Sequence, residues 1–220
     1  MSTHASRSGL PPISVGDLSD ELPSSYPHEL VEIIEAANGQ RVTVRPVLPC
    51  DAAKFQAFVN GLSDTSRTYR FLSGLRRLPL PMLQRLTRID YRSHMALVAE
   101  TLRDGMPIII AETRYAVDPC REGAELAVAV ADEWQGLGLA KALLRRLIGH
   151  AAAVGLRRLH GETLASNACI LHLASTAGFA IMAVPGVAGV LQLSRNIASQ
   201  SPLAPGQAFP RPFTEQLTPC

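Results

Sequence analysis

The sequence has few aromatic residues, little net charge and no paired cysteines, and each of these shortages excludes a class of protein. Only 5% of the 220 residues are aromatic, and the formal net charge is +2. A charge this small argues neither for a nucleic-acid partner nor for a membrane surface. No CxxC pair is present and no His/Cys cluster has metal-ligand spacing, so we expect no metal site.

Long apolar runs are also missing. The richest stretch, from Ile181 to Leu193, is interrupted by Pro185, Gly186 and Gly189, whereas a membrane-spanning helix needs about 18 apolar residues in succession. The N-terminus carries no apolar leader-like run. We therefore expect a cytoplasmic protein with no membrane contact. Its four cysteines should be reduced thiols: Cys50, Cys120, Cys169 and Cys220.

The hydrophobic fraction of 47% is sufficient for one well-buried domain. Residues 1–27 are rich in serine, proline and small polar side chains, and residues 198–220 are rich in proline. Neither segment can bury enough apolar surface to offset its ordering entropy. We predict a disordered N-terminal tail over 1–27, one domain over 28–197 and a Pro-rich C-terminal tail over 198–220.

Within the domain, alternating and helical hydrophobic patterns predict a mixed α/β sheet. Asn38-Gly39 and Arg103-Asp104-Gly105 suit tight turns, Asp51 suits a helix N-cap, and Gly155 and Gly178 suit helix ends. The expected strands are 29–34, 41–47, 95–101, 107–115, 123–131, 159–164, 179–184 and 189–193. The expected helices are 51–62, 66–72, 81–89, 139–154 and 167–177.

The most informative segment joins strand 123–131 to the helix that starts at Leu139. Gly136 and Gly138 let the backbone approach a ligand, and the first N–H groups of a helix have no partner within it. With the positive end of the helix dipole, these donors suit a phosphate or pyrophosphate. A Walker A loop is absent, and the Rossmann fingerprint fails because Lys141 occupies its last position.

Gln135, Gly138 and Ala140 fulfil the pattern [RQ]xxGx[GA], which resembles motif A of the GNAT superfamily of acyl-CoA-dependent N-acyltransferases. On the pattern alone, a Gly-rich turn without a ligand fits as well. Sequence on both sides strengthens the resemblance, which covers about residues 40–195. The residues outside the motif that support the resemblance are Val44-Arg45-Pro46, Asp51, Asn167 and Gly178-Phe179.

Further segments resemble the bacterial protein lysine acetyltransferase (Pat) branch of that superfamily: Arg70-Phe71, 86–91 and 95–99. The resemblance implies a mostly antiparallel sheet, flanked by helices, with a V-shaped cleft between strands 123–131 and 159–164. Acetyl-CoA is the implied co-substrate, and the acceptor is a protein lysine or a small amine. The residues implied in cofactor binding are Val128, Ala129, Val130, Gln135, Gly136, Leu137, Gly138, Leu139, Ala140, Lys141 and Asn167.

Glu125 is the candidate general base. An amine must be neutral to attack a thioester, and a lysine side chain titrates near ~10.4. Glu125 precedes Gln135 by ten residues, at a position where relatives carry a catalytic glutamate; a solvated carboxylate at a strand start is the alternative. Alternation puts Glu125 on one face with Ala127 and Ala129. The tyrosine that serves many relatives as general acid is replaced by Ala174, and we name no acid.

Several features leave alternatives open. Residues 67–92 carry seven arginines against one acid; they form a solvated basic face, or they meet an acidic protein or a phosphorylated substrate, with nucleic acid the weakest option. His160-Gly161-Glu162 resembles the HxE of zinc deaminases, but the PCxxC that should follow is missing. An acyl-CoA-binding module without turnover remains the alternative to an enzyme, and a homodimer stays open.

Overall fold

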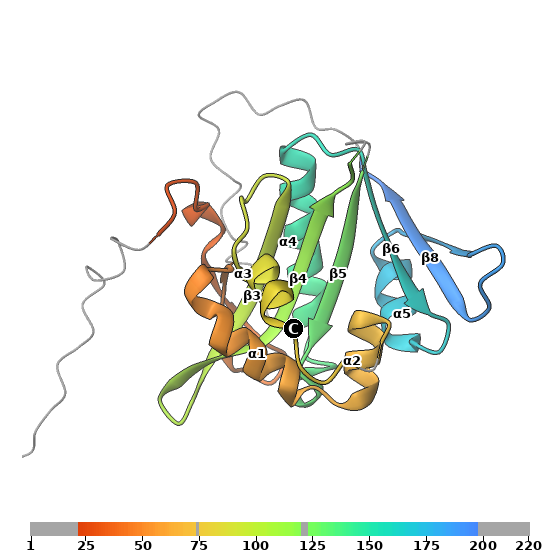
Figure 1. Ribbon diagram of the computed structural model, residues 1–220. Helices are drawn as coiled ribbons and strands as arrows, with labels where there is room; N and C mark the ends of the chain where they lie inside the picture. Colours follow the sequence, from red (N-terminus) through yellow and green to blue (C-terminus); the bar gives the residue numbers. More distant parts are fainter. Residues whose placement is uncertain (1–21, 74, 120–122, 198–220) are drawn as a thin grey trace, which may run out of the picture.

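The computed structural model of the chain describes residues 22–73, 75–119 and 123–197, and its centre is an eight-stranded sheet in the order β1-β2-β3-β4-β5-β6-β8-β7 (Figure 1). Neighbouring strands are antiparallel except for β5 and β6, which are parallel. The expected mixed, mostly antiparallel sheet is therefore confirmed. The strands are β1 (Glu32–Glu35), β2 (Arg41–Pro46), β3 (His94–Arg103), β4 (Met106–Val117), β5 (Ala124–Val130), β6 (Arg158–Leu164), β7 (Ala180–Ala183) and β8 (Val190–Asn196).

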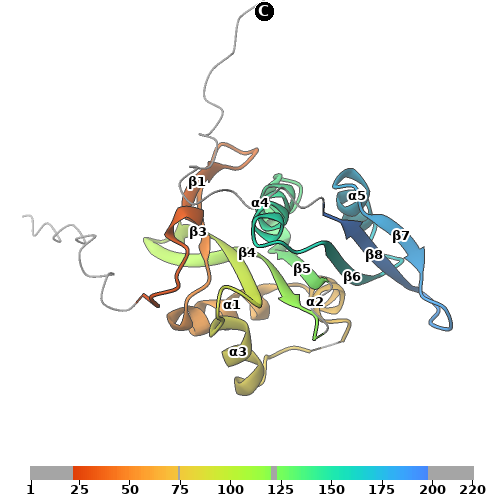
Figure 2. The same ribbon diagram turned by 90° about the horizontal axis from the view of Figure 1, so that it is seen from above.

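Helices cover both faces of this sheet. Figure 2 shows α1, α2 and α3 on one face and α4 and α5 on the other. The helices are α1 (Ala52–Gly61), α2 (Asp64–Phe71), α3 (Leu80–Thr87), α4 (Leu139–Ala153) and α5 (Ala168–Thr176), with short 3-10 helices η2 (His28–Leu30), η3 (Pro49–Asp51) and η4 (Asp132–Trp134). The expected strand 29–34 begins late because η2 occupies its first residues.

The two faces bury separate hydrophobic clusters. Under α4, Leu143 and Leu147 pack against Met95 and Leu97 of β3. Under α1 and α3, Phe55 and Leu83 lie in the cluster that contains Ala96 and Val98 of the same strand. The unbroken apolar run from Met95 to Ala99 is thus explained, since a strand that is covered on both faces needs no polar alternation.

Glycines end the two helices that follow the central strands, as expected. Gly155 has a φ of 83° after α4, and the N–H of Leu156 donates to the carbonyl of Ala151. Gly178 has a φ of 76° after α5, and the N–H of Phe179 donates to the carbonyl of Ala174. Both are Schellman motifs, in which a residue with left-handed backbone and the residue after it donate their N–H groups to carbonyl oxygens of the last helical turn.

Asp51 does not cap α1, contrary to our expectation. It ends η3 in helical conformation, and its side chain makes no capping hydrogen bond to the first turn of α1. Its buried carboxylate instead accepts from the backbone N–H of Leu48 at 2.8 Å and pairs with Arg45 and Lys54 at 2.7 and 2.9 Å. Because both cations also reach Glu100 of β3, this network fixes α1 to the sheet.

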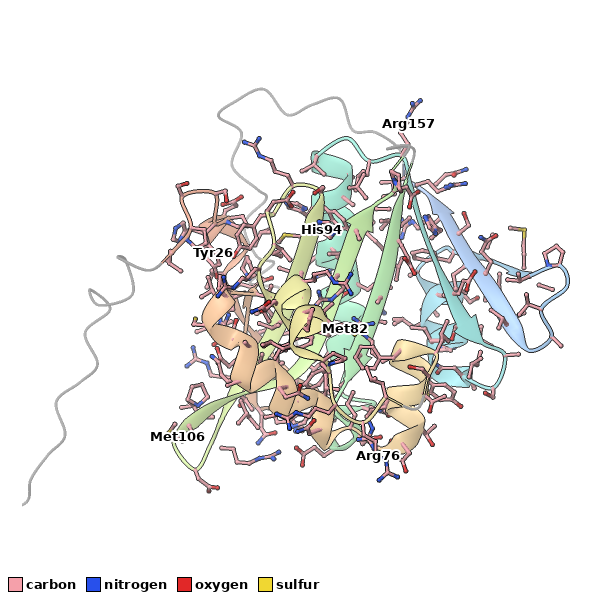
Figure 3. All side chains as sticks on the ribbon, in the orientation of Figure 1. Tyr26, Arg76, Met82, His94, Met106 and Arg157 are labelled. Carbon is pink, nitrogen blue, oxygen red and sulfur yellow. The ribbon has the colours of Figure 1, made fainter. Side chains whose placement is uncertain are left out.

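The ordered fold extends upstream of the expected boundary at residue 28. Tyr26, labelled in Figure 3, is buried, its hydroxyl donates to the carbonyl of Pro46 at 3.3 Å, and its ring meets Tyr91 edge to face. Residues 1–21 and the tail 198–220 lie outside the described residues, as do Cys120 and Cys220. Cys50 and Cys169 are free thiols. In the part of the chain that is described, no helix is long and apolar enough to cross a membrane.

Candidate active site

β5 and β6 splay apart after a short parallel pairing, and we call the region between their diverging backbones the cleft. The two strands pair at only two positions, Ala124 with Leu159 and Glu125 with His160, and then diverge (Figure 1). Gly161 lies at the vertex, where a Cβ on it would stand 2.9 Å from the carbonyl oxygen of Leu126. Only glycine therefore allows β6 to pass so close to β5 before the strands part. Arg157, just before β6, marks the joined end of the strands in Figure 3, and Arg76, after α2, marks the open end.

Backbone groups of β5 point into this cleft. The N–H of Ala131 donates to the carbonyl of Ile110 on β4 at 2.8 Å. Since successive amides of a strand alternate in direction, Ala129 also turns its N–H toward β4, and Val128 and Val130 turn theirs toward the cleft. These two groups can donate to a carbonyl oxygen lying between the strands, whereas the N–H of Ala129 faces β4 and its methyl group packs against the cluster under α1 and α3.

The turn before α4 presents a row of free donors. Gly136 and Gly138 have φ values of 76° and 83°, and Ala142 is the first residue whose N–H enters the helical pattern, donating to Gly138. Among the described residues, no acceptor meets the backbone N–H groups of residues 136–141. The space in front of the glycines is open, with no atom within 4 Å of an added Cβ. This turn therefore fits a diphosphate, and exposed Lys141 stands beside it.

Glu125 is exposed and lies on the face of β5 that carries α1, α2 and α3. The alternation is confirmed by burial, because Ala124 and Leu126 lie in the cluster under α4 and Ala129 borders the opposite one. Ala127 and Ala129 follow Glu125 on this face, both are partly buried, and Ala129 packs against the cluster under α1 and α3. The carboxylate of Glu125 itself is exposed.

Helix α2 lies across the open end of the cleft (Figure 1). The sequence predicts a helix in this part of the chain but not its position beside the cleft. Ser63 and Ser66 donate to the carboxylate of Asp132 at 2.6 and 2.7 Å, and the hydroxyl of Tyr69 donates to the carbonyl of Ser166 at 3.0 Å. Burial alone would raise the pKa of Asp132, but the hydrogen bonds from the serines outweigh it and lower that pKa. These contacts join residues 66 to 97 positions apart, so no local pattern reveals them.

Gln135 links the same helix to the turn. Its side-chain amide donates to the carbonyl of Val130 and to the hydroxyl of Ser66, both at 3.2 Å. Gln135 therefore has a structural role, because its side chain connects the end of β5 to the turn before α4 and holds α2 against both.

Asn167 caps α5, as expected from its position. Its side-chain oxygen accepts from the N–H of Ile170 at 3.2 Å, and a contact with the cofactor arm stays a prediction. Ala174, the position of the general acid in many relatives, is buried. Cys169 and His172 are both exposed, and the described residues contain no group of His, Cys, Asp and Glu side chains that could hold a metal ion.

Part of the basic segment 67–92 is neutralised within the fold. Arg67 pairs with Asp64 on α2, and Arg70 pairs with Glu112 of β4 at 2.7 Å. Arg76 is 83% exposed at its side chain and only approaches Asp64, at 4.0 Å. The segment is therefore a mixture of anchoring arginines and solvated ones, which favours the solvated basic face over a dedicated binding surface.

Comparison with known proteins agrees with this geometry. Residues 66–179 match the profile of the Acetyltransferase (GNAT) family. The chain is 36% identical over 143 residues to Acetyltransferase PA5475 of Pseudomonas aeruginosa, covering 64% of this chain and 76% of that protein. It is 30% identical over 141 residues to Acetyltransferase Pat of Mycolicibacterium smegmatis, covering 61% of this chain and 40% of that protein.

A solved structure extends the match to the whole fold. The GNAT domain of S. lividans PAT superposes with a TM-score of 0.70 at 28% identity, covering 78% of this chain and 99% of that domain. These similarities confirm the family resemblance that the sequence motifs indicated, including its Pat branch.

Proposed function

Because this chain belongs to the GNAT family of acetyltransferases, we propose that it transfers an acetyl group from acetyl-CoA to a protein lysine, with Glu125 as the general base. Acetyl-CoA is the acetyl donor of this family. The observation that carries the proposal is the β5–β6 cleft, with free amide donors at its open end and the exposed Glu125 at its vertex.

In this proposal, each part of the cleft has one role in binding or catalysis. The N–H groups of residues 136–141 bind the diphosphate, and the pantetheine arm lies between the two strands. The N–H of Val128 donates to the thioester carbonyl, where it stabilises the negative charge that develops on the oxygen. Glu125 removes a proton from the amine, since only the neutral amine attacks.

The lysine acceptor is proposed from the kinship with two Pat proteins and from the approach to Glu125. The carboxylate of Glu125 is exposed, and the next two residues on the same face of β5 are the small Ala127 and Ala129. A long, flexible side chain can reach it without entering a closed pocket. Proteins of the cytoplasm are the proposed acceptors.

A free-thiol assay with acetyl-CoA tests this function against an acyl-CoA synthetase, a polyamine and an aminoglycoside. We expect the protein to accelerate thiol release and to acetylate a lysine, which mass spectrometry would locate. Glu125→Gln should keep CoA affinity and lower turnover by about 10²-fold, the scale of general-base loss. Glu35→Gln, on the edge strand β1, is the matched control and should leave turnover unchanged.

The outcomes separate the alternatives. If CoA binds but no amine accelerates thiol release, the chain is a binding module and not an enzyme. If only the small amines react, the lysine acceptor is wrong. If Glu125→Gln turns over like the unmodified protein, Glu125 is not the base.

A further inference from the structure

Asp118 and His160 form a polar pair beside the vertex of the cleft. The Nε2 atom of His160 on β6 lies 2.9 and 3.0 Å from the two carboxylate oxygens of Asp118, which follows β4. The side chains are 24% and 17% exposed, so they are largely shielded but still in contact with water. The pair therefore joins two strands that are not neighbours, since β5 runs between β4 and β6.

Gly123 makes this contact across β5 geometrically feasible. A Cβ on Gly123 would lie 3.1 Å from the Oδ2 atom of Asp118 and 3.2 Å from the Nε atom of Arg158. A side chain at this position would crowd the carboxylate, which would have to shift by a few tenths of an ångström. Gly123 directly precedes β5 and leaves room at the place where Asp118 reaches toward His160.

His160 is also the register partner of Glu125, in the last pair before the strands diverge. Paired residues of neighbouring strands point to the same face and stand about 5 Å apart. Leu159 and Ala124 lie in the cluster under α4, so His160 and Glu125 both point to the opposite face. An oriented imidazole therefore stands at the position paired with the proposed base. Its hydrogen bonds go to Asp118 and none goes to Glu125, so a proton passes between Glu125 and His160 through water.

The reaction releases two protons from nitrogen. A lysine ammonium and acetyl-CoA give the acetylated amine, free CoA thiol and one proton: the N–C bond forms and the C–S bond breaks. One of the two protons that leave the nitrogen ends on the thiolate sulfur, and the other goes to solvent. A single carboxylate holds one proton at a time, so Glu125 must lose the proton it has accepted before the next turnover begins.

We propose that His160, oriented by Asp118, is the proton-relay residue of this site, which takes the proton from Glu125 and passes it to water. This inference rests on the proposed function, because it assumes that Glu125 is the base. A carboxylate only accepts hydrogen bonds, so Nε2 of His160 carries a hydrogen and Nδ1 is the nitrogen that exchanges protons. Asp118 acts through the imidazole and is a positioning residue.

Other charged groups face the pair and belong to its environment. Arg158 and Glu162 lie on the same face of β6, two residues to either side of His160, and Glu125 faces it from β5. On β8, the partner of His160 is the uncharged Ser194. Among the described residues, no third His, Cys, Asp or Glu side chain completes a metal-binding group with this pair.

The pH dependence of kcat/KM tests the relay in the full chain, with acetyl-CoA and the accepted amine. His160→Gln should lower turnover by about 10²-fold, the lower end of the range for proton-transfer groups, and should reduce the limiting slope of log kcat/KM at low pH by one. Asp118→Asn should lower turnover but keep the slope, since the imidazole remains. CoA affinity should not change in either variant.

His172→Gln, on the exposed side of α5, is the matched control and should keep both turnover and slope. If His160→Gln unfolds, imidazole rescue of His160→Ala and the near-isosteric Asp118→Asn carry the test. Unchanged turnover and an unchanged slope in the His160 variant would overturn the relay while the proposed function stands, provided that Glu125→Gln loses turnover. If Glu125→Gln is also silent, the proposed base falls and the relay falls with it.

Discussion

The guanidinium of Arg70 on α2 donates to the buried carboxylate of Glu112 on β4 at 2.7 Å. Glu112 is fully buried, and its other oxygen accepts from Arg114 at 2.8 Å. Burial alone would raise the pKa of Glu112, but the two guanidinium groups outweigh it and hold that pKa below its usual range. Because Glu112 is the register partner of Ala129, this ion triad anchors α2 directly beside the cleft.

Glu112→Gln should destabilise the fold severely. The amide has nearly the same shape but leaves Arg70 and Arg114 without their buried counter-charge, and breaking one partner of a buried ion pair costs about 3–5 kcal/mol. Urea unfolding at pH 7 measures the free energy of unfolding. Glu133→Gln is the control, because its exposed pair with Arg103 is worth less than about 1 kcal/mol. Equal effects of the two substitutions would contradict the structural role of Glu112.

Gly138→Ala should weaken CoA binding. Gly138 has a φ of 83° and Gly105, in the β3–β4 turn, has a φ of 76°, and an added Cβ meets no atom within 4 Å at either position. Alanine therefore strains both backbones equally, by about 1 kcal/mol. Only the methyl group on Gly138 enters the space in front of the free amide donors.

Calorimetry with CoA compares the two alanine variants. We expect Gly105→Ala to bind like the unmodified protein and Gly138→Ala to lose at least about tenfold in affinity, which corresponds to ~1.4 kcal/mol. Equal affinities in all three proteins would remove the diphosphate from this turn.

Local sequence signals predict most of the fold, because they depend on residues close together in the chain. Burial on both faces of the sheet explains the apolar run from Met95 to Ala99. The left-handed backbone at the ends of α4 and α5 explains the glycines there. The glycine-containing turn before α4 is predictable in the same way. Asp51 is the counter-example: its type and position suit an N-cap, but Arg45 and Lys54 hold its carboxylate instead.

The walls of the candidate site were not predictable, because they are built from distant residues. Tyr69 and Ser166, which meet across the cleft, are 97 positions apart in the sequence, and Asp118 and His160 are 42 positions apart. In the sequence, His160 suggests only a false likeness to a zinc deaminase. Its partner becomes visible once β5 and β6 are placed side by side.

Acid should destabilise the protein through the network of Asp51 and Glu100. Burial alone would raise the pKa of each carboxyl, but the hydrogen bonds and charges of Arg45 and Lys54 outweigh it, so both pKa values lie below their usual range. A carboxyl whose pKa is lower in the folded state stabilises the fold at a pH above its unfolded value, near ~4. That contribution is lost as the pH falls through the folded-state pKa.

Asp51→Asn should therefore lower the free energy of unfolding by about 3 kcal/mol at pH 7, and the gap to the unmodified protein should narrow as the pH falls below ~4. Urea unfolding at a series of pH values measures this gap. Asp104→Asn is the matched control, because Asp104 is exposed in the β3–β4 turn with a φ of 53°, a conformation that asparagine tolerates. A gap that stays constant with pH would mean that the carboxylate of Asp51 does not stabilise the fold through its charge.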